Sequence, residues 1–220
     1  AKAPNDPNAQ GRKKHAGDAI FEDVNNDGQL DSKDMIFMGY VRPDKVGGII
    51  NTLKYKGLTV RIVMDWAMGH VIDNGFKGQI MGSSRNNNNA IKEAMTNSWQ
   101  SANDGSKYPK YTVQSDYDYQ YRNHMRWDNQ IGSSASGSTN NSLYFSKGDY
   151  LAFREVSLSY MLPLSWIRKM RLSAVEVFAG AYNIGYIKKY DGMFPEIYTG
   201  VDYGIYPRPR QYNMGVKINF

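Results

Sequence analysis

The chain has 220 residues, no cysteine and a formal net charge of +6, from 27 Lys and Arg against 21 Asp and Glu. The lack of cysteine excludes disulfides, thiolate metal sites and cysteine nucleophiles. The mean hydropathy is −0.61, and no segment has the roughly 18 consecutive apolar residues that a transmembrane helix needs. Any membrane-spanning part must therefore consist of β-strands. The longest basic run, residues 12–14, is too short to indicate nucleic-acid binding.

Residues 1–44 are expected to form an irregular loop that contains a metal-binding motif. Within it, residues 23–34 (DVNNDGQLDSKD) place oxygen ligands at positions 1, 3, 5, 7, 9 and 12, with Gly28 at position 6 where the chain must turn sharply. This spacing surrounds Ca²⁺ with hard oxygen atoms. The candidate ligands are Asp23, Asn25, Asp27, Gln29, Asp31 and Asp34.

Two alternatives remain open for this motif. Position 12 is Asp34 rather than the glutamate that usually binds Ca²⁺ through both oxygens, so Mg²⁺ or weaker Ca²⁺ binding is one alternative. No helical pattern flanks the loop, which therefore lacks the helices of an EF-hand. The second alternative is an Asx-rich surface turn that binds no metal.

A hairpin is predicted after this loop, with strands over 46–55 and 58–68. The pair Lys56-Gly57 between them fits a two-residue turn. In the second strand, large apolar residues alternate with residues that include Arg61 and Asp65. One face of the hairpin should therefore be apolar and the other wet, with Arg61 and Asp65 forming a salt bridge on the wet face.

Residues 69–148 show no sustained periodicity and are rich in Asn, Ser, Gly and Tyr. A connection of this length argues against a compact soluble domain. It is typical of the long external loops of transmembrane β-barrels.

Three more strands are predicted over 150–162, 172–183 and 210–220. In the first, the apolar face changes parity near Arg154-Glu155, which predicts a β-bulge. Residues 164–171 are a short connection with one helical turn, and residues 184–208 form a loop. The last strand alternates up to the terminal Phe220, as in a strand between lipid and a wet lumen. A strand at the edge of a soluble sandwich is the alternative.

The connections between the five strands are alternately short and long: 56–57, 69–148, 163–171 and 184–208. Outer-membrane barrels have short periplasmic turns and long extracellular loops. This pattern predicts that the C-terminus is periplasmic and that residues 1–44 are extracellular. Residues expected to face the lumen are Arg61, Asp65, Glu176 and Lys217.

Several segments together resemble SusC-like (RagA-like) TonB-dependent outer-membrane transporters of the Bacteroidetes. They follow the order of that family along the chain. They are residues 17–18 and 23–34, 55–57 (YKG), 148–163 (GDYLAFREVSLSYMLP), 177–183 (VFAGAYN), 206–208 (YPR) and the terminal aromatic strand. The long loop matches only near Trp99 and at residues 108–111.

This resemblance implies a fold, a function and partners. The fold would be all-β, with these five antiparallel strands at the C-terminal end of a barrel of about 22 strands. The N-terminal plug and the remaining strands are absent from the 220 residues, so the chain is expected to be a fragment or one part of a longer polypeptide. The implied function is TonB-powered import of oligosaccharides or peptides, with a SusD-like surface lipoprotein as lid. Residues implied as a signal for the barrel-assembly machinery are Asn213, Gly215, Ile218 and Phe220.

Tyrosines are concentrated in the two long loops, where they could contact the lid or a ligand. Membrane-interface girdles and packing within the loops are the alternatives. The candidate contacts are Tyr108, Tyr111, Tyr117, Tyr119, Tyr190 and Tyr198.

No hydrolase, phosphate-loop or metalloprotease motif occurs, so the chain is not expected to be an enzyme. A soluble calcium-dependent β-sandwich, acting as an adhesin or glycan-binding module, is the alternative to the transporter. Solubility without detergent would favour the sandwich. Co-purification with a lipoprotein would favour the transporter.

Overall fold

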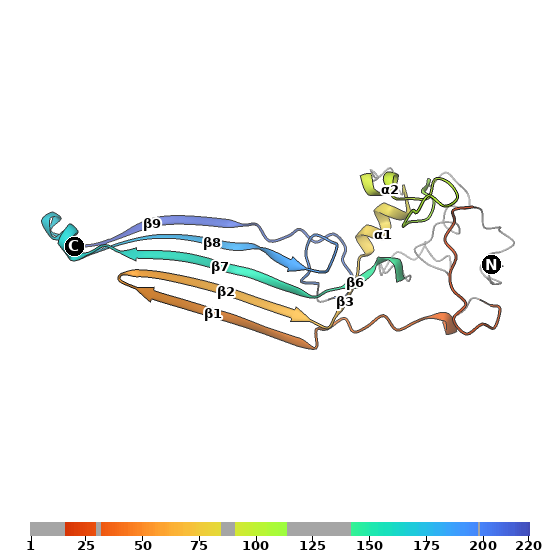
Figure 1. The fold of residues 1–220 in the computed structure, drawn as a ribbon, viewed down its shortest axis with the longest axis horizontal. Helices are drawn as coiled ribbons and strands as arrows, with labels where there is room; N and C mark the ends of the chain where they lie inside the picture. The colour runs from red at the N-terminus through yellow and green to blue at the C-terminus, as the bar shows by residue number, and fades with distance from the viewer. Residues whose placement is uncertain (1–15, 30–31, 85–90, 114–141, 198) are drawn as a thin grey trace. The chain divides into compact units, whose positions relative to one another are not determined.

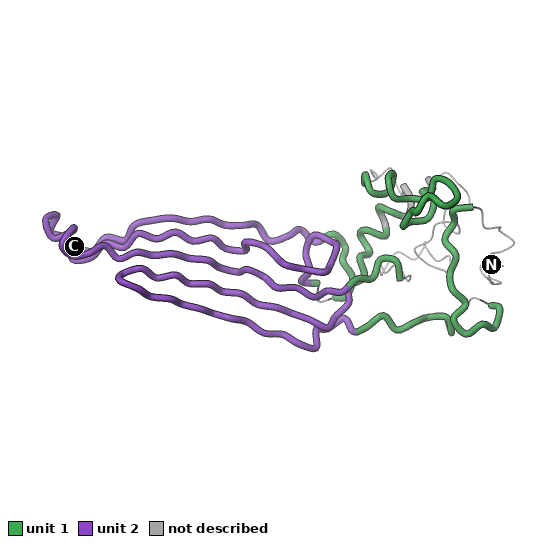
Figure 2. Tube along the Cα trace, in the orientation of Figure 1, with its two compact units in different colours: residues 1–39, 72–146, 197–204 green, residues 40–71, 147–196, 205–220 purple. Residues whose placement is uncertain are grey.

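The computed structural model describes residues 16–29, 32–84, 91–113, 142–197 and 199–220. The chain divides into two compact units, each built from segments that are distant in sequence (Figure 2). Unit 1 comprises residues 1–39, 72–146 and 197–204, and unit 2 comprises residues 40–71, 147–196 and 205–220. The segments with strong two-residue alternation all belong to unit 2.

Unit 2 contains an antiparallel sheet of five strands in the order β1-β2-β7-β8-β9 (Figure 1). These strands are β1 (Lys45–Tyr55), β2 (Leu58–Met68), β7 (Tyr150–Met161), β8 (Ala174–Lys188) and β9 (Gln211–Asn219). The five antiparallel strands are thus confirmed. β8 ends at Lys188, beyond the predicted end at residue 183, whereas the other bounds agree within two residues.

The β1–β2 hairpin closes through Lys56 and Gly57, whose φ angles are +46° and +85°. Positive φ at both central residues defines a type I′ turn, whose twist matches that of the paired strands. Tyr55 is paired with Leu58 directly next to the turn. This register places the apolar residues of both strands on one face.

The predicted bulge is present in β7. Val63 pairs with Glu155 and Met64 pairs with Phe153, so Arg154 is the additional residue. A one-residue insertion reverses the facing of the side chains that follow it. The bulge therefore keeps Phe153 and Val156 on the same face despite their odd separation in sequence.

The connection between β7 and β8 contains α4 (Leu164–Ile167) and the 3-10 turn η4 (Arg168–Met170). The predicted helical turn is therefore confirmed. Among the described residues, β1 and β9 each pair with only one strand, so the sheet is open at both edges. None of the described helices has the length and apolar character needed to cross a membrane.

Unit 1 contains short elements that the sequence pattern did not predict, because residues 1–44 and 69–148 were both expected to be loop. They are short and have no long amphipathic period. They are η2 (Ser32–Asp34), most of β3 (Val71–Asp73), α1 (Gly75–Gly82), β4 (Ser83–Ser84), α2 (Lys92–Thr96), β5 (Thr112–Val113), η3 (Ser142–Tyr144) and most of β6 (Phe145–Lys147). β3 pairs with β6, and β4 pairs with β5 in parallel.

Backbone hydrogen bonds join the distant segments of unit 1. The amide of Asp73 donates to the carbonyl of Gly200 at 2.9 Å, and the amide of Asp202 donates to the carbonyl of Asp73 at 2.8 Å. The amide of Asn74 donates to the carbonyl of Tyr144 at 3.0 Å. Parts of both predicted long loops therefore form one packed unit, with a small core that contains Met81, Ala94, Tyr108 and Tyr144.

The hairpin turn provides a test of this fold. Gly57→Ala keeps a left-handed backbone, which costs a residue with a Cβ about 1 kcal/mol. The new Cβ would also lie 2.8 Å from the carbonyl oxygen of Met161. The Met161 amide donates to the Gly57 carbonyl at 2.9 Å, so we expect its hydrogen exchange to accelerate by at least about fivefold.

Gly105→Ala is the matched control, because Gly105 also has positive φ but has no atom within 4 Å of an added Cβ. Its effect on exchange at Met161 should be negligible. Equal exchange at Met161 in both variants would contradict the close packing of the turn.

Candidate functional site: the two faces of the sheet and the loop of residues 23–34

One face of the five-stranded sheet, hereafter the apolar face, carries apolar side chains on every strand. The register aligns one residue from each strand in a continuous row across this face. The row consists of Leu53, Val60, Leu158, Ala179 and Met214. A row of this kind on an uncovered surface indicates contact with a partner or with lipid.

The apolar face is exposed to its surroundings. Met214 is 86 % exposed and Phe220 is 93 % exposed. Val60, Ile62 and Met64 are partly exposed rather than enclosed in a core. The eleven residues of β2 match the roughly 9–11 residues of a tilted membrane-spanning strand.

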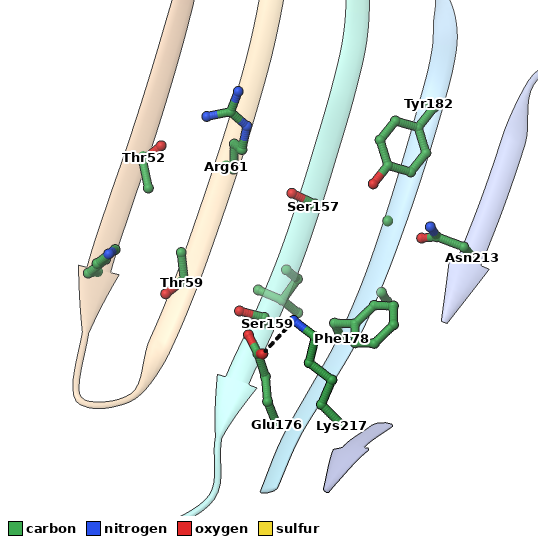
Figure 3. Close-up of a pocket in the computed structure, with 14 residues that line it drawn as sticks. Thr52, Thr59, Arg61, Ser157, Ser159, Glu176, Phe178, Tyr182, Asn213 and Lys217 are labelled. Atoms are coloured by element: carbon green, nitrogen blue, oxygen red, sulfur yellow. Dashed lines mark ion pairs between the residues drawn. The ribbon is translucent and has the colours of Figure 1, made fainter. Parts of the chain in front are cut away.

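The opposite face, hereafter the polar face, contains a hollow whose lining residues include many with hydroxyl, amide or charged side chains (Figure 3). Arg61, Glu176 and Lys217 line this hollow, and Lys217 pairs with Glu176 at 3.6 Å. Asn213 of β9 also lines it. Three of the four predicted lumen residues therefore lie together, and Asp65 lies on the same face nearer the other end of β2.

The predicted salt bridge between Arg61 and Asp65 is wrong. Arg61 pairs instead with Glu155 at 3.4 Å, and Asp65 pairs with Arg154, whose second guanidinium contact with it is 2.7 Å. Four residues along one strand span about 13 Å, whereas side chains on neighbouring strands are about 5 Å apart. Ion pairs on this face therefore form between strands rather than along them.

A second ion cluster on unit 2, hereafter the Glu196 cluster, was not predicted. The Glu196 side chain is only 2 % exposed and pairs with Arg154 at 2.6 Å and with Arg208 at 3.3 Å. The Tyr186 hydroxyl donates to the same carboxylate at 2.6 Å. Since Arg154 also binds Asp65, the cluster connects β2, β7 and β8 to the segment after β8.

The sequence carried only a partial signal for this cluster. The bulge at Arg154 was predicted, and a bulge re-aims a side chain. Glu196 lies in an aperiodic segment, where no pattern distinguishes a buried carboxylate from an exposed one. Burial of the carboxylate and its pairing with two arginines emerge only from the tertiary structure.

The described part of the 23–34 motif folds as a tight turn. The two carboxylate oxygens of Asp23 accept the amides of Asp27 and Gly28 at 3.2 and 2.8 Å. Asp34 accepts the amide of Val24 at 2.9 Å, which brings the two ends of the motif together. Gly28 has a φ of +80°, the left-handed conformation that position 6 requires.

Hydrogen bonds keep the Asp27 carboxylate ionised. Its pKa is lowered below the ordinary value, first by the backbone amide of Gln29 and then by the side chain of Asn25. Asp31 lies outside the described residues. Over the described ranges, no group of three or more His, Cys, Asp or Glu side chains converges as a metal site would. The described carboxylates of the turn are directed mainly to backbone amides.

The candidate tyrosines differ in how far they are buried. Tyr108 and Tyr190 are buried, and Tyr108 stacks on Tyr144 and donates a 3.0 Å hydrogen bond to Glu93. These two rings therefore pack inside their units and present no surface for a ligand or lid. Tyr111 is partly buried. Tyr117, Tyr119 and Tyr198 lie outside the described residues.

The Glu196 cluster predicts a large difference between two charge-neutralising variants. Glu196→Gln leaves the largely buried Arg154 without one of its carboxylate partners and removes an ion partner of the more exposed Arg208, which should lower the free energy of unfolding by about 3 kcal/mol. Glu176→Gln removes only the exposed pair with Lys217 and should cost less than about 1 kcal/mol. Urea unfolding in detergent measures both. Equal costs would contradict a structural role for the cluster.

Both curated proteins and solved structures include relatives of the chain. No protein-family model matches the chain. "TonB-dependent receptor P3" of Formosa agariphila is 25 % identical over 216 residues, covering 93 % of this chain and 19 % of the receptor. "TonB-dependent receptor P26" of the same organism is 23 % identical over 216 residues, covering 93 % of this chain and 20 % of the receptor. The chain thus spans about a fifth of the length of these curated relatives.

Solved structures of RagAB share the fold. "Structure of the RagAB peptide transporter" matches with a TM-score of 0.58 and 23 % identity, covering 82 % of this chain and 17 % of that one. The RagAB peptide importer in the "closed-closed" state matches with a TM-score of 0.57 and 21 % identity, covering 84 % and 18 %. The relatives are named receptors and transporters, in agreement with the prediction that the chain is not an enzyme. The predicted resemblance is confirmed: the chain is similar to TonB-dependent receptors along nearly all of its length and has the fold of part of the RagA-like barrel.

Proposed function

We propose that the chain supplies five neighbouring strands and attached loops of a TonB-dependent outer-membrane importer. The observation that carries this proposal is the exposed apolar face, which extends over all five strands and is opposite a polar face. In a barrel, the apolar face contacts lipid and the polar face lines the lumen.

A soluble β-sandwich is less consistent with the same observation. A sandwich buries one face of each sheet against a second sheet about 10 Å away. Here Leu53, Leu158 and Met214 remain exposed within the described part of the chain. Lipid provides the cover that no described strand provides.

The open edges support incorporation into a larger barrel. β1 and β9 each present one unpaired edge among the described strands. In hydrocarbon, each backbone N–H or C=O group without a partner costs several kcal/mol. Further strands, from polypeptide beyond the residues described here, would satisfy these groups and close the ring.

The alternating connections support an orientation. The β1–β2 and β7–β8 connections are short and lie at the same end of the sheet, and the long connections join the other end. By the usual arrangement of outer-membrane barrels, the short turns and Phe220 are periplasmic. The parts of the chain in unit 1, including residues 23–34, are then extracellular.

The partners follow from the same proposal. A SusD-like surface lipoprotein would close the barrel from outside, and TonB would act through an N-terminal part. The barrel-assembly machinery would read β9 through Asn213, Gly215, Ile218 and Phe220. The solved RagAB structures are named as peptide importers, which supports peptides as the cargo class, with oligosaccharides as the alternative.

Adjacent lysine substitutions on opposite faces test the membrane assignment. Ile62 pairs with Val156 on the apolar face, and Val63 pairs with Glu155 on the polar face. A lysine on the lipid face near the bilayer midplane costs about 2–4 kcal/mol. We therefore expect Ile62→Lys to reduce the folded, heat-modifiable protein in the outer-membrane fraction severalfold, whereas Val63→Lys keeps near-wild-type levels beside Glu155. Similar losses in both variants would refute exposure of that face to lipid.

We also propose that residues 23–34 bind Ca²⁺, with Mg²⁺ as the alternative, and stiffen an external loop. The candidate ligands other than Asp31, which lies outside the described residues, are Asp23, Asn25, Asp27, Gln29 and Asp34, and hydrogen bonds shape the turn that carries them. Bound cation would replace the amide donors with a stronger positive partner for the carboxylates.

Asp23→Ala combined with Asp27→Ala should remove one equivalent of bound calcium, measured by elemental mass spectrometry of the purified protein. The barrel should remain folded, while hydrogen exchange in residues 16–44 increases. Asp104→Ala is the matched control, since Asp104 also accepts backbone amides in a tight exposed turn. Unchanged calcium content in the double variant would rule out the site.

A further inference from the structure

The connection between β7 and β8 combines exposed apolar and basic side chains in one short segment. Leu164, Trp166 and Met170 are each more than half exposed, with Trp166 at 65 %. Arg168, Lys169 and Arg171 are also exposed. Residues 162–175 contain no Asp or Glu, so the segment has a local charge of +3 from these three residues.

This segment, hereafter the basic turn (residues 163–171), is held in a defined conformation. The amide of Leu162 donates to the carbonyl of Val175 at 2.9 Å, and the amide of Trp166 donates to the carbonyl of Pro163 at 2.9 Å. Ile167 is almost completely buried, so it anchors α4. The exposed side chains are therefore displayed by an ordered turn, and little conformational entropy would be lost on binding.

The basic turn directly adjoins the apolar face. The last full row of that face before the turn contains two tyrosines and consists of Tyr55, Leu58, Tyr160, Val177 and Val216. The amide of Ser173, just after the turn, donates to the carbonyl of Asn219 at 2.8 Å. Figure 1 shows α4 at the end of the sheet where the chain terminates. Aromatic residues at the limit of an apolar band lie at the depth of lipid headgroups.

We infer that the basic turn binds the headgroups of anionic phospholipids in the leaflet next to the short connections. Trp166 would lie at the interface, and the three cations would contact headgroup phosphates. The inference rests on the proposed membrane location and adds a lipid class and a site to it. Continuity with the apolar face and the unbalanced positive charge favour a lipid surface over a protein partner.

The test uses the whole importer that contains these 220 residues, reconstituted in nanodiscs of phosphatidylethanolamine mixed with phosphatidylglycerol. Retained phosphatidylglycerol is measured by native mass spectrometry for the wild type and for Arg168→Gln/Lys169→Gln/Arg171→Gln. Each cation near an anionic surface raises the affinity for that surface by a factor of about five. We expect the preference for phosphatidylglycerol to be at least about fivefold weaker in the triple variant than in the wild type. The wild-type preference should also weaken as salt is raised.

The matched control is Arg42→Gln/Lys45→Gln/Lys147→Gln, which removes three exposed charges from unit 2 near the opposite end of the strands. It should retain the wild-type preference. Equal preference in the wild type and the basic-turn variant would overturn the inference while leaving the membrane location intact. Failure of the wild type to enter nanodiscs would contradict the proposed function and the inference with it.

Discussion

The structure of unit 2 depends on one constraint: each strand has an apolar face that must be removed from water, and no described strand covers it. Burial of apolar surface is the main favourable term in folding, so a row such as Leu53, Val60 and Leu158 needs an apolar cover, from lipid or from further polypeptide. In the proposed barrel, lipid would cover this face along the whole sheet. The same constraint accounts for the bulge at Arg154, because without it Phe153 and Val156 would lie on opposite faces of the sheet.

The polar face is organised by charge rather than by packing. Arg61 and Asp65 each find partners on β7, and the buried Glu196 carboxylate joins two arginines and a tyrosine at one end of the sheet. A buried ion cluster contributes little net stability, but loss of one member leaves uncompensated charge. Such a cluster therefore fixes a loop in one position. The segment that carries Glu196 is thereby held against strands of unit 2, next to the path that the proposed cargo would follow.

The two ends of the sheet differ in the connections that they carry. The short connections carry the basic turn, where aromatic and cationic groups would face lipid headgroups. The long connections contribute segments to unit 1, in which residues near Asp73, Tyr144 and Gly200 are joined by backbone hydrogen bonds. Packing of distant loop segments into one body limits their conformational freedom. A cation bound in residues 23–34 would extend this rigidity to another loop.

The sequence alone determined the five strands, the parity of their faces, the bulge and the family resemblance, because two-residue alternation is a local property and each apolar face has to be continuous. It also placed Arg61, Glu176 and Lys217 on one face. The choice of ion partners, the burial of Glu196, Tyr108 and Tyr190, and the short elements of unit 1 were decided only by the tertiary structure. These features depend on contacts between segments far apart in sequence, for which an aperiodic loop gives no local signal. Side-chain parity can be read along a single strand, whereas a partner on the neighbouring strand is fixed only when the strands pair.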